Sequence, residues 1–251
     1  ITDSIVYAKS IQKAMLPAPD ALSHHFPESF VIFKPRDIVS GDFYWVDEFE
    51  DKIIVACADC TGHGVPGAFM SLIGSALLKE VARTAEVHSP SIALSYLDSE
   101  LREMLNREGN KFGVQDGMDI SIVEIDKKTL KFRGASAKRP IVIYKNGRLL
   151  ELKGDRFSIG GDAHGSQTKN YTLHELDLEP GDIVYQFSDG ISDQFGGSLG
   201  KKLKKTGLLE IIGELAHLNL TEQGRLIRER FKEWQGSLAQ VDDVIMLGVK
   251  I

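Results

Sequence analysis

The hydrophobic residues of this chain fall into two patterns: short apolar runs of strand length, and longer stretches with apolar residues three and four positions apart. The first pattern predicts strands at 30–34, 42–49, 52–58, 119–125, 129–135, 141–145, 148–152, 171–176, 182–187 and 244–250. The second predicts helices at 1–16, 67–83, 91–106, 206–218 and 221–234. Asn146-Gly147, between two of the strands, is the dipeptide most typical of a tight hairpin turn.

The order of these elements predicts the fold class. Strands follow one another in runs with short connections, and helices come in consecutive pairs. This is not the alternation of strand and helix that builds a doubly wound parallel sheet. We therefore expect a layered α+β fold, with mostly antiparallel sheets and helices packed on them.

The first predicted helix forms a region of its own. Pro17 and Pro19 end it, so residues 1–17 are predicted to be an N-terminal linker or signalling helix and 18–251 the main domain. The apolar face of the helix carries Ile1, Ile5, Ala8, Ile11 and Met15. This spacing fits a coiled-coil seam as well as packing on the domain's own core, and two heptads do not decide between them.

Composition narrows the functional classes. A hydrophobic content of 42% and a charged content of 26% are ordinary for a globular protein with a substantial core, as one large domain or two small ones. The formal net charge of −6 provides no basic field for nucleic acid, so we expect no nucleic-acid partner. The two cysteines argue against a disulfide framework and fit a reducing compartment.

The cytoplasm is therefore the expected location. No apolar stretch approaches the ~20 residues that span a bilayer, and no signal peptide is recognisable. The chain starts at Ile1 inside a predicted helix. We expect a piece of a longer protein, which leaves open that it is the cytoplasmic domain of a membrane-anchored sensor.

Four short acidic motifs are the main candidates for a functional site. They are Ser40-Gly41-Asp42-Phe43, Ala58-Asp59-Cys60-Thr61-Gly62-His63-Gly64, Ser188-Asp189-Gly190 and Asp242-Asp243. Three place an aspartate beside a glycine or at the end of an apolar run, and the fourth opens the run 244–250. Carboxylates that converge from several strand ends would form an oxygen-rich site for hard divalent cations. Two bridged cations can activate water for phosphoester hydrolysis.

Other motifs are weaker. Gly62-His63-Gly64-Val65-Pro66-Gly67 matches a dinucleotide-binding glycine loop, but two predicted helices follow it, and Asp59 would repel a pyrophosphate. Cys57 and Cys60 match C-x-x-C, but three positions apart in a strand they point to opposite faces and are expected to be packed. The lysine-rich run 201–205 is predicted to be a solvated loop, with substrate docking as the alternative.

Three residues keep more than one interpretation. His63, between two glycines, fits a general acid that protonates a leaving alkoxide, and equally a packed turn residue. For Asp119, a turn with its own hydrogen bonds is favoured over a weaker cation ligand, and Asp116 stays open between the two.

Taken in order, the motifs resemble a known family. The residues that carry the resemblance are Ile11-Gln12-Lys13-Ala14-Met15-Leu16-Pro17, Ser40-Gly41-Asp42, Ala58-Asp59-Cys60-Thr61-Gly62-His63-Gly64-Val65-Pro66, Phe187-Ser188-Asp189-Gly190 and Val241-Asp242-Asp243-Val244. The sequence resembles the metal-dependent protein serine/threonine phosphatases of the 2C type, in the bacterial branch of the sporulation stage II E and sigma-factor-regulator U phosphatases. The resemblance runs from residue 11 to the C-terminus. It implies two antiparallel sheets packed as a sandwich with helix pairs outside, an αββα arrangement.

The resemblance also implies a site with two Mn²⁺ or Mg²⁺ ions, with a third as an option. The ligands carried over by motif are Asp42, Asp59, the backbone carbonyl of Cys60, Asp189 and Asp242. Asp59 would bridge both ions, and Asp42 would bind mainly through water. Asp116, Asp193 and Asp243 are implied as supporting residues or additional ligands. Because a metal-bound water is the nucleophile, His63 is the one further candidate for a catalytic side chain.

The implied function is hydrolysis of phosphoserine and phosphothreonine on a partner protein, usually the phosphorylated antagonist of an anti-sigma factor. In this branch the domain follows an N-terminal sensor. The helix with Gln12 and Leu16-Pro17 resembles the linker between the two, which often forms a homodimer. The helix pair after Gly67 would then position Asp59 and the Cys60 carbonyl.

Two other function classes compete with this one. The first is a catalytically weak phosphatase fold that binds or senses, and the four intact carboxylate motifs argue against it. The second, a nucleotide-binding oxidoreductase, rests on the glycine loop alone. Neither Lys34 nor Arg36 matches the arginine with which eukaryotic relatives grip phosphate, so the sequence identifies no phosphate clamp.

Overall fold

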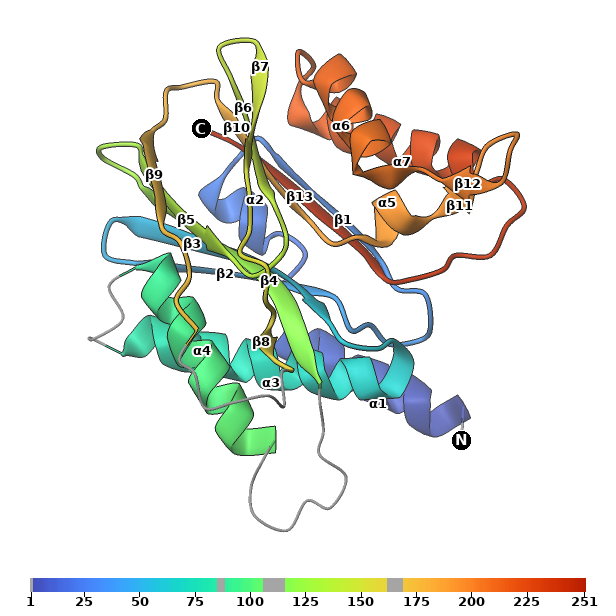
Figure 1. Ribbon diagram of the computed structural model, residues 1–251, viewed down its shortest axis with the longest axis horizontal. Coiled ribbons are helices and arrows are strands. Elements are labelled where there is room, and N and C mark those ends of the chain that lie inside the picture. Colours follow the sequence, from blue (N-terminus) through green and yellow to red (C-terminus); the bar gives the residue numbers. More distant parts are fainter. Residues whose placement is uncertain (1, 85–88, 106–115, 162–168) are drawn as a thin grey trace.

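The computed structural model describes residues 2–84, 89–105, 116–161 and 169–251. They form two antiparallel sheets packed face to face, with helices on both outer sides (Figure 1). The five-stranded sheet has the order β1-β13-β10-β6-β7. The six-stranded sheet has the order β2-β3-β4-β5-β9, with β8 paired to β4. The predicted α+β sandwich is confirmed.

The strands have the following bounds. The five-stranded sheet contains β1 (Ser29–Lys34), β13 (Val244–Lys250), β10 (Ile183–Phe187), β6 (Ile141–Lys145) and β7 (Arg148–Leu152). The six-stranded sheet contains β2 (Phe43–Phe49), β3 (Lys52–Cys60), β4 (Gly117–Asp126), β5 (Lys131–Ser136), β9 (His174–Asp177) and β8 (Ile159–Gly160). β6 and β7 turn at Asn146 and Gly147, whose positive φ values of 52° and 73° are those that the predicted hairpin turn requires.

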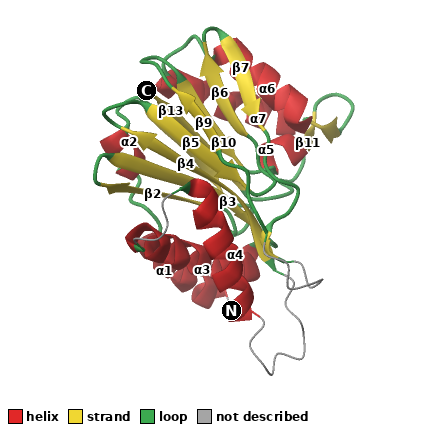
Figure 2. Cartoon of the chain, turned by 60° about the vertical axis from the view of Figure 1, so that its left-hand side comes forward, coloured by secondary structure: helices red, strands yellow, loops and turns green. Residues whose placement is uncertain are grey.

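Helices cover the outer face of each sheet (Figure 2). α3 (Gly64–Arg83) and α4 (Pro90–Leu105) lie on the six-stranded sheet, and α1 (Thr2–Met15) contacts α3. α6 (Lys204–Leu215) and α7 (Leu220–Gln235) lie on the five-stranded sheet. Shorter elements are α2 (Ala21–His25), α5 (Gly190–Asp193), β11 (Phe195–Gly196) and β12 (Lys201–Lys202). The prediction of a loop at 201–205 is wrong, because this run forms β12 and begins α6.

Apolar side chains fill the spaces between these four layers. The core between the sheets includes Val55, Val123, Ile143, Val184 and Ile245. A second core lies between the six-stranded sheet and α3 and α4, and a third between the five-stranded sheet and α6 and α7. Each large apolar side chain buried in this way contributes about 1.5–3 kcal/mol. The strand ends that carry the acidic motifs are therefore held by rigid supports on both sides.

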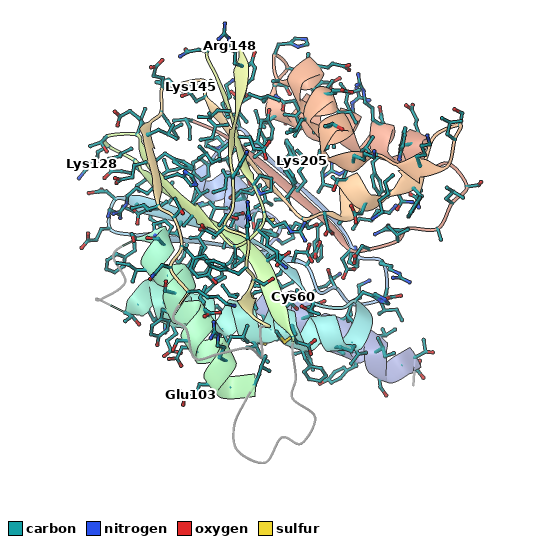
Figure 3. All side chains as sticks on the ribbon, viewed as in Figure 1. Cys60, Glu103, Lys128, Lys145, Arg148 and Lys205 are labelled. Atoms are coloured by element: carbon teal, nitrogen blue, oxygen red, sulfur yellow. The ribbon has the colours of Figure 1, made fainter. Side chains whose placement is uncertain are left out.

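The two cysteines point to opposite faces of β3, as predicted. Both are free and buried. Cys57 lies in the core between the sheets, and Cys60 in the core beneath α3 and α4. Figure 3 shows Cys60 where β3 leads toward α3. Within the described residues α4 is the element that follows α3, which removes the basis for a dinucleotide-binding unit.

α3 corrects one expectation about the sequence. By length and composition it is apolar enough to cross a membrane, so the statement that no segment reaches this limit is wrong. Half of this stretch is buried inside the domain. Its approach to the sheet is close, since a Cβ atom on Gly74 would lie 2.7 Å from the ring of Phe43. We describe α3 as a core helix.

α1 packs through a face that differs from the predicted one. Ile5, Ala8 and Met15 are partly buried, but the buried residue of the helix is Gln12. Ile11 is 44% exposed, so the alternative in which the apolar face packs on the domain's own core does not hold for this residue. Ile1 lies outside the described residues. Hydrogen bonds of Gln12, described below, account for the choice of a polar residue.

Candidate active site

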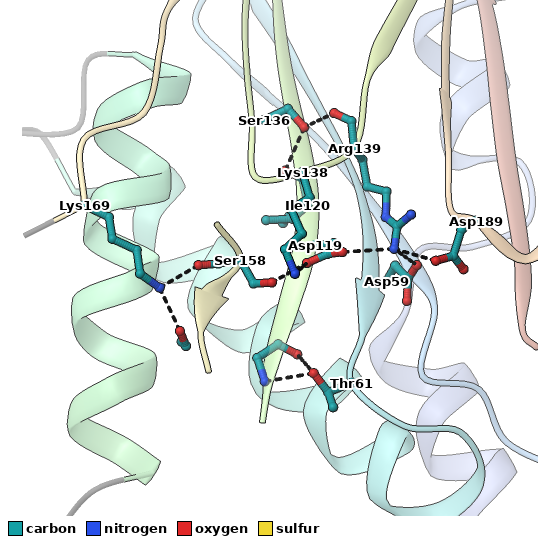
Figure 4. A network of polar contacts seen from close by, with 12 residues as sticks. Asp59, Thr61, Asp119, Ile120, Ser136, Lys138, Arg139, Ser158, Lys169 and Asp189 are labelled. Carbon is teal, nitrogen blue, oxygen red and sulfur yellow. Dashed lines mark hydrogen bonds and ion pairs between the residues drawn. The ribbon is translucent and has the colours of Figure 1, made fainter. Parts of the chain in front are cut away.

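Asp59 and Asp119 lie beside each other at one end of the six-stranded sheet. They are register partners in β3 and β4, so their side chains share a face. Asp189 directly follows Ser188 after β10 of the other sheet, and Arg139 lies in the connection between β5 and β6. Figure 4 shows these four side chains pointing toward one another. Strand pairing and sheet packing therefore bring together charges that are far apart in sequence.

The Arg139 guanidinium lies at the centre of this group. Its Nη2 atom is 2.8 Å from Oδ2 of Asp59, 2.9 Å from Oδ2 of Asp119 and 2.7 Å from Oδ2 of Asp189. Nη2 carries two hydrogens, and it donates them to Asp119 and Asp189. Oδ2 of Asp59 is buried and has no hydrogen-bond partner despite its short distance from Nη2. Asp59 therefore keeps an oxygen whose burial is not compensated by a donor.

The environment of Asp59 disfavours its ionised form. The pKa of Asp59 is raised to about 8. Burial is the largest cause, the Arg139 charge opposes it, and the charges of Asp189 and Asp119 add to it. Burial together with the neighbouring carboxylates therefore outweighs the opposing charge of Arg139. A cation of higher charge would stabilise the carboxylate form.

Asp42 is a second buried carboxylate with an unpaired oxygen. It directly precedes β2, whose first residue Phe43 pairs with Ala58 beside Asp59. The side chain is 3% exposed, and its Oδ2 atom has no hydrogen-bond partner. Burial raises the pKa of Asp42 well above its ordinary value, Asp59 raises it further, and a hydrogen bond with Ser188 lowers it.

Asp242 and Asp243 precede β13 and have different surroundings. Asp243 accepts the backbone N–H of Arg36 on Oδ1 and that of Gly41 on Oδ2, both at 2.7 Å. Asp243 therefore fixes the turn that carries Asp42. Its role as a supporting residue of a metal site stays a prediction. For Asp242, burial raises the pKa, the backbone N–H of Asp243 lowers it, and the charge of Asp189 raises it. Asp42, Asp59, Asp119, Asp189 and Asp242 are called the acidic cluster below.

Glycine allows three backbone segments to meet beside this cluster. A Cβ atom on Gly41 would lie 2.6 Å from the carbonyl oxygen of Gly62, and one on Gly67 would lie 2.4 Å from the same atom. Neither distance is compatible with a side chain. The turn before Asp42, the loop after Asp59 and the first turn of α3 therefore fit together only with glycine at these positions.

His63 lies at the rim of the site. Its Nδ1 atom is 2.7 Å from Oδ2 of Asp37, and both side chains are nearly half exposed. The charge of His63 also lowers the pKa of Asp242. The structure brings His63 to the predicted site, and its role as a general acid stays a prediction.

Three other predicted residues surround the cluster. Asp193 ends α5 and forms an ion pair with Lys202 at 2.7 Å. Asp116 directly precedes β4, three positions from Asp119. Cys60 ends β3, with its side chain in the core. The roles of Asp193 and Asp116, and that of the Cys60 carbonyl as a ligand, stay predictions.

Sequence reasoning did not identify Arg139 and favoured the wrong interpretation of Asp119. Asp119 lies inside β4, not in a turn, and accepts hydrogen bonds from Arg139 and from Ser158 Oγ. Lys138 Nζ is 3.7 Å from Asp119. The available signal was Lys138-Arg139-Pro140, two adjacent cations near a strand end in a chain whose other strand ends carry carboxylates.

A second buried network adjoins the acidic cluster through Ser158 (Figure 4). Lys169 Nζ donates to the carbonyl oxygens of Ser158 and Gly160 and to Oδ1 of Asp98 on α4. Asp98 also accepts the backbone N–H of Gly160. These residues are called the Lys169 cluster below, and they tie β8 to α4.

The acidic cluster fits a hard divalent cation by its chemistry. Its donors are all oxygens, and the oxygens of Asp42 and Asp59 that lack hydrogen-bond partners are buried. Among the described residues, no three His, Cys, Asp or Glu side chains lie close enough to hold an ion as they stand. Arg139 Nη2 lies 2.7–2.9 Å from oxygens of Asp59, Asp119 and Asp189.

Comparison with known proteins identifies the family. The family described as "Stage II sporulation protein E (SpoIIE)" matches residues 50–251. The SiaA-PP2C domain of Pseudomonas aeruginosa has a similar structure, with a TM-score of 0.88 and 32% identity over 100% of this chain and 96% of that one. The PP2C phosphatase domain of SpoIIE from Bacillus subtilis shares the fold, with a TM-score of 0.67 and 20% identity over 89% and 61% of the two chains.

A curated relative agrees with these matches. The phosphoserine phosphatase RsbU of Bacillus subtilis (strain 168) is 26% identical over 200 residues, which cover 77% of this chain and 54% of RsbU. The chain thus spans about half the length of that relative. The predicted resemblance to PP2C-type serine/threonine phosphatases is confirmed by the family match and by the full-length similarity to the SiaA domain. This chain belongs to the stage II sporulation protein E (SpoIIE) family.

Proposed function

We propose that this chain is a Mn²⁺- or Mg²⁺-dependent phosphatase that hydrolyses phosphoserine or phosphothreonine on a partner protein. The observation that carries the proposal is the acidic cluster, in which Asp42 and Asp59 have buried oxygens without hydrogen-bond partners. Membership of the SpoIIE family supports it. A relative in fold, RsbX, has a structure in complex with magnesium, at a TM-score of 0.60 and 17% identity.

Two ions would be held by Asp42, Asp59, the Cys60 carbonyl, Asp189 and Asp242, with Asp59 between them. Bound there, the ions supply an acidified water as the nucleophile and neutralise charge on the phosphoryl oxygens. The protein supplies rigid placement. β3 holds Asp59 within a buried sheet, and Asp243 fixes the turn before Asp42 through two backbone amides.

His63 is proposed to donate the proton that the leaving serine or threonine oxygen needs. The Asp37 carboxylate lies 2.7 Å from Nδ1 and would hold the ring by accepting the hydrogen on that atom. The protonated ring also carries a hydrogen on Nε2, which is the one to be transferred. Asp37 would thus be a positioning residue for His63.

The proposed substrate is a small phosphorylated protein of the kind that antagonises an anti-sigma factor, and the proposed input is an N-terminal sensor. Two relatives support this. One is phosphoserine phosphatase RsbU, and the other is the structure of the RsbU and RsbW domains of Rv1364c from Mycobacterium tuberculosis, which shares the fold at 18% identity. We propose a cytoplasmic location, since the free, buried Cys57 and Cys60 fit a reducing compartment.

Gln12 is proposed to transmit the sensor's state from α1 to the site. Its Nε2 donates to the carbonyl oxygen of Ser40 at 2.6 Å and to Oγ of Ser71 at 2.9 Å, and its Oε1 accepts the Ser40 N–H at 3.2 Å. Ser40 lies two positions before Asp42, and Ser71 lies in α3. One side chain therefore joins α1, the first acidic motif and the helix that follows Asp59.

The proposed homodimer would form through the other side of α1. Tyr7 is 70% exposed, and Ile11 is four positions along the helix. Apolar residues with this spacing form one stripe, and we propose that a second copy of α1 covers it. Light scattering should give a dimer for the wild type and a monomer for Tyr7→Glu/Ile11→Glu. A monomeric wild type would contradict this arrangement.

The phosphatase activity is tested by phosphate release from a phosphoserine peptide and from p-nitrophenyl phosphate, in EDTA and with Mn²⁺ or Mg²⁺. We expect turnover only with metal, and its loss in Asp59→Asn and Asp189→Asn. Asp126→Asn is the matched control, because Asp126 lies at the other end of β4 from Asp119. Metal-independent turnover, or full activity in both variants, would contradict the proposal. Mn²⁺ binding without turnover in the wild type would favour a binding or sensing module.

The coupling role of α1 has a separate test. Removal of residues 1–16, replacement of Gln12 by Leu, and forced dimerisation should each change the Mn²⁺ affinity of the site. Isothermal titration of the folded variants measures it. An affinity equal to that of the wild type in all three would contradict coupling through Gln12.

A further inference from the structure

Arg139 shares its acceptor atoms with the proposed ions. Asp59 and Asp189 are proposed metal ligands, and Oδ2 of each lies within 2.8 Å of Arg139 Nη2. We propose that Arg139 is a tethered cation that competes with the divalent ion for these carboxylates and thereby sets the metal affinity of the site. This inference rests on the proposed function, since it assigns a regulator to the same metal site.

Geometry makes the two cations mutually exclusive. A divalent ion needs its oxygen ligands at about 2.0–2.6 Å. The Nη2 atom stands at the point that Asp59, Asp119 and Asp189 share, at 2.7–2.9 Å from each. An ion held by the Oδ2 atoms of Asp59 and Asp189 would overlap this nitrogen. Metal binding through these atoms therefore requires the guanidinium to leave.

The guanidinium is incompletely satisfied in its place, which lowers the cost of its release. Nε of Arg139 is buried and has no hydrogen-bond partner. Nη2 has two hydrogens for three carboxylates, so Asp59 receives charge but no hydrogen bond. A divalent ion brings twice the charge and can coordinate several oxygens at once. The exchange thus replaces a cation that satisfies only some of the carboxylate oxygens with one that can coordinate more of them.

The backbone around Arg139 is fixed, so the exchange involves the side chain. The Arg139 N–H donates to the Ala137 carbonyl at 2.8 Å, and the Arg139 carbonyl accepts from the Ser136 hydroxyl. Lys138 has a positive φ of 63° and donates its N–H to the Asp155 carbonyl at 2.8 Å. This anchored turn holds the start of a long side chain that is 20% exposed to solvent. Rotation about side-chain bonds can therefore move the guanidinium out without rearranging the sheet.

Competition follows from position and not from protonation. An arginine side chain remains charged throughout the accessible pH range. Removal of Arg139 takes away the competing atom and also makes the cluster more negative, and both changes favour a divalent ion. A residue that merely braced the carboxylates would have the opposite effect, because its loss would weaken metal binding.

The test is isothermal titration of Mn²⁺ into the metal-stripped 251-residue chain and its variants. Arg139→Gln is expected to bind Mn²⁺ about tenfold more tightly, a change of ~1.4 kcal/mol. Arg139→Lys, which keeps a charge on a shorter side chain, is expected to lie between the two. Arg133→Gln is the matched control, because Arg133 is also 20% exposed and pairs with Glu124 across β4 and β5. The affinity of this control should equal that of the wild type.

The outcomes separate this inference from the proposed function. Unchanged or weaker Mn²⁺ binding in Arg139→Gln, beside normal binding in the wild type, would overturn competition by Arg139. No Mn²⁺ binding by the folded wild type would overturn the proposed metal site itself. Circular dichroism establishes folding of each variant. If Arg139→Gln does not fold, Arg139→Lys decides, since tighter binding supports the inference and equal or weaker binding refutes it.

Discussion

The Lys169 cluster and the acidic cluster lie on either side of Ser158, and both bury charged groups, but they satisfy those groups differently. The Lys169 ammonium carries three hydrogens, and its acceptors among the described residues lie at 3.1 Å on Asp98, 2.7 Å on Ser158 and 2.8 Å on Gly160. In the acidic cluster Arg139 offers two hydrogens on Nη2 to three carboxylates. Oδ2 of Asp59 and Nε of Arg139 remain without partners.

This difference supports the proposal that the acidic cluster binds a cation, whereas the Lys169 cluster serves structure. A buried polar group without a partner costs about 1–3 kcal/mol, so a network formed only for stability should not contain several. The Lys169 cluster meets this condition at Lys169 and joins β8 to α4. The acidic cluster contains several buried polar groups without partners. What its carboxylate oxygens lack is positive charge and coordination. A divalent cation would supply both.

The largest expected effect is on catalysis, from a substitution in the acidic cluster. Asp59→Asn should lower the rate of phosphate release by about 10³-fold or more, because it removes the proposed bridging carboxylate and several kcal/mol of transition-state stabilisation. In EDTA and above pH 8 the same variant should be at least as stable as the wild type, since it lacks the ionised Asp59 carboxylate that burial and the neighbouring carboxylates disfavour. Enzyme kinetics and urea unfolding in EDTA measure the two effects. A clear loss of stability would show that Asp59 has a structural role like that of Asp98.

The corresponding change in the Lys169 cluster should affect stability. Asp98→Asn should lower the free energy of unfolding by about 3 kcal/mol, because it removes a buried carboxylate charge 3.1 Å from the ammonium of Lys169, which is only 10% exposed. Asp51→Asn is the control, since Asp51 pairs with the exposed Lys128 and should cost under about 1 kcal/mol. Urea unfolding measures both. Equal losses would remove the distinction between a buried network and a surface ion pair.

Metal should stabilise the protein through the acidic cluster alone. At 100 times its Kd, Mn²⁺ should add about 2.7 kcal/mol to the free energy of unfolding, as required for a ligand that binds only the folded state. Asp98→Asn should keep this increment relative to its own value in EDTA, and Asp59→Asn should lose it. Urea unfolding of the three proteins with and without Mn²⁺ provides the comparison. An undiminished increment in Asp59→Asn would place the ion elsewhere.

Much of the fold could be predicted because its signals are local. β6, β7 and β13 have the predicted bounds, since each is a regular apolar run limited by turn residues or the chain end. β8 and α5 have two and four residues, too few for a periodic pattern, and β8 is held by the distant Asp98. In α1 the pattern placed Ile11 on the packed face, but long-range hydrogen bonds to Ser40 and Ser71 bury Gln12 instead.

In the candidate site, too, the residues with a local signal could be predicted and the others could not. The aspartates of the four motifs were identifiable because each lies beside a glycine or at the edge of an apolar run. Arg139 has no motif, and its contacts depend on the register of β3 with β4 and on the packing of one sheet against the other. Asp119 follows Gly117 closely and resembled a turn residue, whereas its strand pairing places it opposite Asp59. Local sequence therefore specified the proposed ligands better than it specified their counter-charge.

The smallest effect tests whether the two clusters act together. Ser158 joins them, because its hydroxyl donates to Asp119 and its carbonyl accepts from Lys169. Ser158→Ala removes the first contact and should cost about 1.5 kcal/mol, the lower end for a hydrogen bond to a charged group. Lys169→Met should already release this segment, so Ser158→Ala should cost about 1 kcal/mol less in its presence. Urea unfolding of the wild type, both single variants and the double variant gives this coupling. If the two costs add to within about 0.5 kcal/mol, the clusters are independent. The Lys169 cluster would then be a separate site, and not a structural network that positions the acidic cluster.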